Sequence, residues 1–167
     1  MRQVVIALGQ APIAEQLDMA ALVMIAIILG SLTGMERRKA DKPAGTRTHA
    51  LVAGAAALIT AISIAAVESF GSGDPTRGLH AVITGIGFLG AGAILHPRSG
   101  TQGPTGLTTA ASIFYTACVG VAVAAGYVVV ACIATFLEFA LLRLVGMWRY
   151  RHEKSQNVSP ADTDLVE

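Results

Sequence analysis

The sequence predicts an all-α membrane protein, a bundle of about five transmembrane helices that pack closely through small residues. Of its 167 residues, 53% are hydrophobic and only 14% are charged, whereas charged residues make up about 25% of a typical soluble domain. The apolar residues gather in five long runs, and the basic residues lie between the runs in an asymmetric pattern. The net charge of +1 gives no indication of a nucleic-acid partner. We therefore expect the lipid bilayer to be the main surroundings of the chain.

Five runs are long enough to cross a hydrocarbon core of about 30 Å, which takes roughly 20 helical residues. They cover residues 19–35, 50–67, 79–95, 107–125 and 126–145. Glu15 and Asp18 precede the first run where a signal peptide would carry basic residues, so we expect a permanent anchor. The last two runs touch without a charge between them. Two spans joined by a turn at Gly126 are the preferred interpretation, and one long helix or a re-entrant pair is the alternative.

The basic residues predict the orientation. With five spans, ten of the 12 Lys and Arg residues fall on one side of the membrane, namely Arg37, Arg38, Lys39, Lys42, Arg47, Arg98, Arg143, Arg149, Arg151 and Lys154. Cytoplasmic loops carry an excess of Lys and Arg, so this side should be cytoplasmic. The chain then divides into an extracytoplasmic arm (residues 1–18), a transmembrane domain (residues 19–145) and a cytoplasmic polar tail (residues 146–167) that we expect to be disordered.

Small residues recur about every four positions in four of the spans. The stripes are Ala26, Gly30 and Gly34; Ala50, Gly54, Ala57, Ala61 and Ala65; Ala81, Gly85 and Gly92, with Gly87 and Ala91 beside them; and Ala117, Gly120 and Ala124. Such stripes let helices approach closely in lipid, which predicts a tight bundle without a wide pore. Gly85, Gly87 and Gly90 also spell a dinucleotide motif, but it lacks the acidic residue that should follow. We expect no cofactor there, and helix packing or a locally unwound helix instead.

Two acidic residues are candidates for a metal site. Glu138 lies halfway along the fifth span, where a charge is expensive. Pairing with a polar group in the bundle is the simpler interpretation, and a proton or cation site is the functional one. Asp74 precedes Pro75 and the third span, a common N-cap signal, with a divalent-cation contact as the alternative. No Ser/His/Asp set or metal cluster is present in the sequence, so we expect no enzyme.

Further polar residues lie where the spans enter the predicted cytoplasmic side. Glu36 is not explained by a role in orientation, and we expect it to pair with Arg47 across the first loop. Thr108 or Thr105 should cap the start of the fourth span, where free N–H groups favour an anion. Cys118 and Cys132 lie in apolar runs and are expected to be buried thiols.

Three stretches resemble the MgtC/SapB family of bacterial inner-membrane proteins. They read GSLTGMERRKADKPAGTRTHALVAGAAALIT, DPTRGLHAVITGIGFLGAGAIL and GLTTAASIFYTACVGVAVAAG, and they lie in this order between residues 30 and 126. The residues that match the family motifs are Glu36, Arg37, Arg47, Thr48, His49, Asp74, Arg77, Gly85, Gly87, Gly90, Gly92, Thr108 and Thr109. The chain departs from the family at Thr105, where members often have Arg, and at Thr84, where they usually have Ser.

The resemblance implies a protein linked to magnesium homeostasis and, in pathogens, to survival inside host cells. It implies one of two functions: a regulator that contacts other membrane proteins, such as a transporter or the proton-translocating ATP synthase, or a small Mg²⁺ or other cation transporter. A transporter with five spans would need to form a homo-oligomer. Some members carry a soluble domain after the last span, for which the 21 residues from Met147 to Glu167 are too few.

Overall fold

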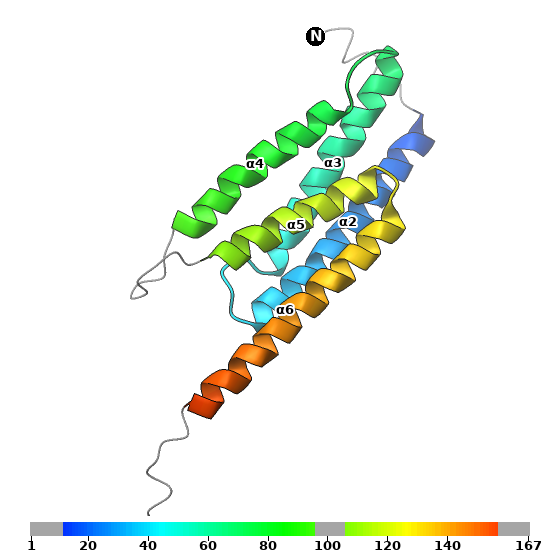
Figure 1. The fold of residues 1–167 in the computed structure, drawn as a ribbon. Coiled ribbons are helices and arrows are strands. Elements are labelled where there is room, and N and C mark those ends of the chain that lie inside the picture. Colours follow the sequence, from blue (N-terminus) through cyan, green and yellow to red (C-terminus); the bar gives the residue numbers. More distant parts are fainter. Residues whose placement is uncertain (1–11, 96–105, 157–167) are drawn as a thin grey trace, which may run out of the picture.

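The computed structural model describes residues 12–95 and 106–156, and these two ranges form five helices without a strand (Figure 1). The helices are α2 (Ile13–Lys39), α3 (Thr46–Phe70), α4 (Thr76–Leu95), α5 (Leu107–Ala124) and α6 (Val128–Gln156). All five are long and apolar enough to cross a membrane. The prediction of an all-α bundle with five spans is therefore confirmed, and the chain is a multi-pass membrane protein.

A glycine turn separates the last two helices. Gly126 has φ of 86°, in the left-handed region that glycine adopts without steric cost. Its N–H donates to the Val123 carbonyl at 3.0 Å, and the N–H of Tyr127 donates to the Ala122 carbonyl at 2.8 Å. This pair of bonds is the Schellman arrangement that ends many helices. Two spans joined at Gly126 are therefore confirmed, and one continuous long helix is excluded.

Successive helices run in opposite directions, and α5 lies in the middle (Figure 1). It contacts each of the other four helices, whereas α4 contacts only α3 and α5, and α6 contacts only α2 and α5. The α2–α3 loop and the start of α5 lie at one end of the bundle, which we call the basic end because residues 37–47 carry five Lys and Arg side chains there. The α3–α4 loop and the turn at Gly126 lie at the opposite end.

Glycines set the close contacts among α2, α3 and α5. A Cβ atom on Gly30 would lie 2.5 Å from the carbonyl oxygen of His49, and one on Gly34 would lie 2.5 Å from Cα of Thr46. A Cβ atom on Gly120 would collide with the carbonyl oxygen of Ala53. Only a residue without a side chain permits these approaches. The predicted small-residue packing is confirmed for α2, α3 and α5.

The same prediction is wrong for α4. Gly85 and Gly87 are exposed, and a Cβ atom added to either would have no neighbour within 4 Å. The helix buries Gly78, Val82 and Ile86 instead. It is also continuous, so the unwound interpretation of the glycine motif is wrong as well. Small residues show that a helix surface can be approached closely, but they do not show which element lies opposite.

The helices extend further into polar sequence than the predicted spans. Helix α2 begins at Ile13, inside the predicted arm, and α6 continues to Gln156, inside the predicted tail. Hydropathy detects the apolar section of a helix, whereas the backbone hydrogen bonds continue through polar residues. Cys118 and Cys132 are exposed rather than buried, because each lies on an outward face of its helix.

Asp74 caps the first turn of α4, as predicted. Its Oδ1 accepts the backbone N–H of Thr76 at 2.9 Å and the Thr76 hydroxyl at 2.7 Å. These two hydrogen bonds favour the carboxylate, so the pKa of Asp74 lies below its ordinary value of 3.8. Side chains in this position satisfy N–H groups that the helix itself leaves unpaired.

We expect Asp74→Ala to loosen the start of α4 and Asp74→Asn to leave it nearly intact, because Asn is an equally good N-cap. Since the folded pKa is lowered, the contribution of Asp74 is complete above pH 3.8 and is lost as the pH falls through the folded pKa. Hydrogen exchange of the α4 amides measures the loosening. Thermal melting at neutral and at acidic pH measures the pH dependence. A difference between wild type and Asp74→Ala that is as large in acid as at neutral pH would contradict a stabilising role of the Asp74 charge.

Candidate functional site

Polar side chains from four helices meet inside the bundle near its basic end. All six are buried: Thr33 and Arg37 from α2, His49 from α3, Thr109 and Ser112 from α5, and Glu138 from α6. Buried polar groups are costly unless they are hydrogen-bonded. Their meeting at one place therefore marks the strongest candidate for a functional site in the described part of the chain.

Glu138 faces α2. The Thr33 hydroxyl donates to its Oε2 at 3.0 Å, and the residue is only 6% exposed. This confirms the simpler interpretation, a polar partner within the bundle. Its Oε1 has no hydrogen-bond partner among the described residues. Arg143 lies over the ring of Phe139, 6.0 Å from the ring centre, rather than on the carboxylate.

Arg37 is the cation of the cluster. It is 3% exposed, and its Nη2 donates to the Thr109 hydroxyl at 2.9 Å. The guanidinium also interacts electrostatically with Glu36 and Glu138. Its Nε is buried and has no hydrogen-bond partner among the described residues. The hydrogen bond to Thr109 ties α2 directly to α5.

His49 connects α3 to α5 and is fully buried. Its Nδ1 lies 3.0 Å from the Gly45 carbonyl, which can only accept, so Nδ1 carries a hydrogen. Its Nε2 lies 3.3 Å from Oγ of Ser112, and that hydroxyl also lies 2.9 Å from the Thr109 carbonyl. The single hydroxyl hydrogen of Ser112 can serve one of these two acceptors at a time.

The structure brings together five of the predicted site residues, Glu36, Arg37, His49, Thr109 and Glu138, and separates the others. Asp74 and Arg77 are exposed at the opposite end of the bundle. The glycines of the motif, Gly85, Gly87, Gly90 and Gly92, lie on α4, which contributes no side chain to the cluster. Sequence reasoning missed Thr33, although its place four residues before Arg37 puts it on the same face of α2.

Two predictions at the basic end are wrong. Glu36 forms no ion pair with Arg47 in the described part of the chain and interacts with Arg37 instead. No side chain of the described residues caps α5, so the predicted cap from Thr108 is wrong: the N-cap is Gly106, and Thr108 lies exposed in the first turn. Thr105 lies outside the described residues. Gly106 has φ of 93°, so a left-handed glycine starts this helix where a hydroxyl was expected.

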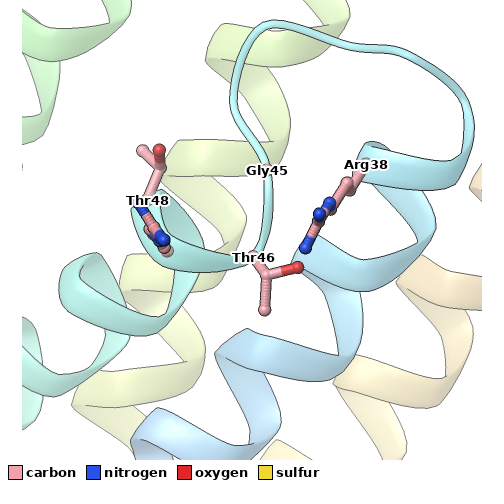
Figure 2. A pocket seen from close by; sticks show the side chains of 5 residues that line it. Arg38, Gly45, Thr46 and Thr48 are labelled. Carbon is pink, nitrogen blue, oxygen red and sulfur yellow. The ribbon is translucent and has the colours of Figure 1, made fainter.

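A pocket of about 410 Å³ opens between the end of α2 and the start of α3 (Figure 2). Its lining residues are Arg38, Gly45, Thr46, Arg47 and Thr48. Arg47 and Thr48, two of the predicted site residues, therefore belong to this pocket rather than to the buried cluster.

Comparisons with known proteins agree on one family. The sequence model of the MgtC family matches residues 23–150. An uncharacterized protein of Haemophilus influenzae is 40% identical over 149 residues, which are 85% of this chain and 62% of that protein. Protein SrpB of Synechococcus elongatus is 37% identical over 146 residues, covering 83% of this chain and 79% of its own length. The putative magnesium transporter YhiD of Escherichia coli K12 is 40% identical over 111 residues, covering 63% of this chain and 49% of its own length. No solved structure matches the chain.

Proposed function

This chain belongs to the MgtC family, and from that premise we propose that it is a non-catalytic membrane regulator linked to magnesium homeostasis or membrane energetics. It would act through contacts with other membrane proteins, such as a transporter or the ATP synthase. The link to magnesium is supported by the relative whose name is putative magnesium transporter. The exposed glycine face of α4 supports the mode of action, because another helix can approach such a face closely.

The observation that carries this proposal is the guanidinium of Arg37 inside the buried cluster. Its positive charge acts electrostatically on Glu36 and Glu138, although it forms an ion pair with neither of these described residues. Mg²⁺ requires several oxygen ligands in a nearly ideal octahedron, and a fixed cation beside the two carboxylates repels it. The positive charge of Arg37 therefore favours a structural or regulatory role of the cluster over a cation path.

The rest of the predicted cation path is not assembled in the described residues. Asp74 lies at the opposite end and already accepts two hydrogen bonds from Thr76. Transporters often bind their ions at broken helices near the midplane, whereas α4 is continuous. No group of three or more His, Cys, Asp or Glu side chains that could hold a metal occurs among these residues. These findings also favour the regulator.

Mg²⁺ transport is the second candidate, and one observation favours it. Glu138 Oε1 and Glu36 Oε2 are buried and have no hydrogen-bond partner in the described ranges. Carboxylate oxygens in this state are available to a proton or a cation. Several copies of the chain would be needed, because five spans are few for a transport path.

Proteoliposomes distinguish the two candidates. The full chain is reconstituted around a Mg²⁺-sensitive dye, with Glu138→Gln and protein-free vesicles as controls and an ionophore to show that the dye responds. The same variants are tested for restoring growth at low magnesium to a bacterium that lacks its own family member. We expect restored growth with the wild type and no Mg²⁺ flux above protein-free vesicles. Flux that disappears in Glu138→Gln would overturn the regulator.

We further propose that the protein lies in the inner membrane with its basic end in the cytoplasm. Residues 37–47, which span the end of α2, the loop and the start of α3, support this orientation through the positive-inside rule, because they include Arg37, Arg38, Lys39, Lys42 and Arg47. Reporter fusions test it: a periplasm-active reporter after Val67 should be active, and a cytoplasm-active reporter after Leu95 should be active. The reverse result would refute the orientation while leaving the antiparallel fold unaffected.

A further inference from the structure

We propose that the pocket between the end of α2 and the start of α3 binds a phosphate group at the membrane surface. The pocket lies in the loop that joins two membrane-spanning helices, so it opens near the lipid headgroups. The phosphate can belong to an anionic phospholipid or to free inorganic phosphate. This proposal is independent of whether the protein regulates or transports.

Two arginines give the pocket its charge. Arg38 comes from the last turn of α2 and Arg47 from the first turn of α3, so the pocket is lined by both helices. Neither guanidinium forms an ion pair with a carboxylate of the described residues. In Figure 2, Arg38 and the Thr46 hydroxyl are turned toward one another at the opening. Arginine presents a planar fork of donors that matches the oxygens of a phosphate, and threonine hydroxyls add further donors.

The start of α3 provides backbone donors beside these side chains. Its N-cap is Gly45, and no side chain caps the first turn. The first N–H groups of a helix have no partner within the helix, and its dipole favours an anion at this end. Phosphates bind in such places in many proteins. The helix terminus thus adds to a pocket that already holds two cations.

The buried contacts beneath the pocket hold its backbone in place. Gly34 of α2 packs directly on Thr46, where a Cβ atom would lie 2.5 Å from Cα of Thr46. The Gly45 carbonyl is held by Nδ1 of His49 at 3.0 Å. Donors fixed in this way do not need to be ordered when the ligand binds, which lowers the entropic cost of binding.

A general attraction of the basic loop for anions is the competing explanation. Lys39, the last residue of α2, and Lys42 in the following loop are exposed but do not line the pocket. Removing them takes away the same net charge as removing Arg38 and Arg47. The double variant Lys39→Gln/Lys42→Gln is therefore a control matched in charge and in position along the chain.

The test uses the full chain purified in a neutral detergent and isothermal titration with three probes: short-chain phosphatidylglycerol, short-chain phosphatidylcholine and inorganic phosphate. We expect phosphatidylglycerol or inorganic phosphate to bind the wild type. Arg38→Gln/Arg47→Gln should weaken that binding about tenfold or more, and the lysine control less than about threefold. Binding of phosphatidylglycerol alone identifies a lipid headgroup, and binding of inorganic phosphate identifies the free anion.

Two results would overturn the proposal. One is that the wild type binds neither phosphatidylglycerol nor inorganic phosphate. The other is an equal loss in both double variants, which would show a diffuse charge effect. Arg38→Lys/Arg47→Lys, which keeps the charge and removes the planar fork, covers the case in which the glutamine variant does not fold. It should bind more weakly than the wild type, and unchanged binding would exclude recognition by the guanidinium forks.

Discussion

Gly120→Ala is expected to lower the melting temperature of the purified protein by roughly 6–12 °C, a value that corresponds to about 3 kcal/mol of overpacking. The new Cβ atom would collide with the backbone carbonyl of Ala53 on α3. Ala53 is fully buried, and α5 contacts every other described helix, so neither helix can shift without disturbing the rest of the bundle. Circular dichroism during heating in detergent measures the effect.

Gly87→Ala is the matched control for this substitution. It introduces the same methyl group into another membrane helix, where no atom lies within 4 Å of the new Cβ. Alanine also favours the helix over glycine by about 1 kcal/mol. We expect an unchanged or slightly raised melting temperature. If Gly120→Ala and Gly87→Ala lower the melting temperature by similar amounts, the contact between Gly120 and Ala53 does not limit the packing of α5.

The number of helices and their order could be predicted from the sequence because both depend on local properties. A run of apolar residues defines a span, and a glycine between two runs defines a turn, as at Gly126. The partner of each helix face is not a local property. The small residues of α2 and α4 have the same spacing, yet Gly30 is buried against α3 and Gly85 is exposed. Only the arrangement of the bundle distinguishes them.

The sequence identified several residues of the candidate site but not which of them contact each other. Glu138 could be identified as a charged residue inside a predicted span, and Arg37 as part of a family motif. The hydrogen bond from Thr33 to Glu138 could not be predicted, because it joins residues 105 positions apart in the sequence. The predicted pair of Glu36 and Arg47 is wrong because of the geometry of the helix that carries Glu36. Consecutive residues lie about 100° apart around a helix, so Arg37 turns into the bundle together with Thr33 while Glu36 lies to its side.

Arg37→Met should destabilise the protein by roughly 1.5–3 kcal/mol, because it removes the hydrogen bond that this buried, charged group donates to Thr109. Glu138 is 6% exposed and retains only the Thr33 hydroxyl in that variant. Lys39→Met removes the same charge from an exposed position of the same helix, and we expect it to change the stability by less than about 0.5 kcal/mol. Unfolding by denaturant in mixed micelles provides the free energies.

The double variant Arg37→Met/Glu138→Leu tests whether the two charges depend on each other. Replacing both partners of a buried pair by apolar side chains is often neutral or stabilising, whereas removing one is costly. We therefore expect the double variant to be more stable than Arg37→Met alone, with a coupling of about 2 kcal/mol or more in the double-mutant cycle. If the losses in the free energy of unfolding are additive instead, Arg37 stabilises the bundle through Thr109 alone, and the position of Glu138 does not depend on Arg37. That outcome would also remove the main objection to a cation beside Glu138, because the guanidinium would no longer be its counter-charge.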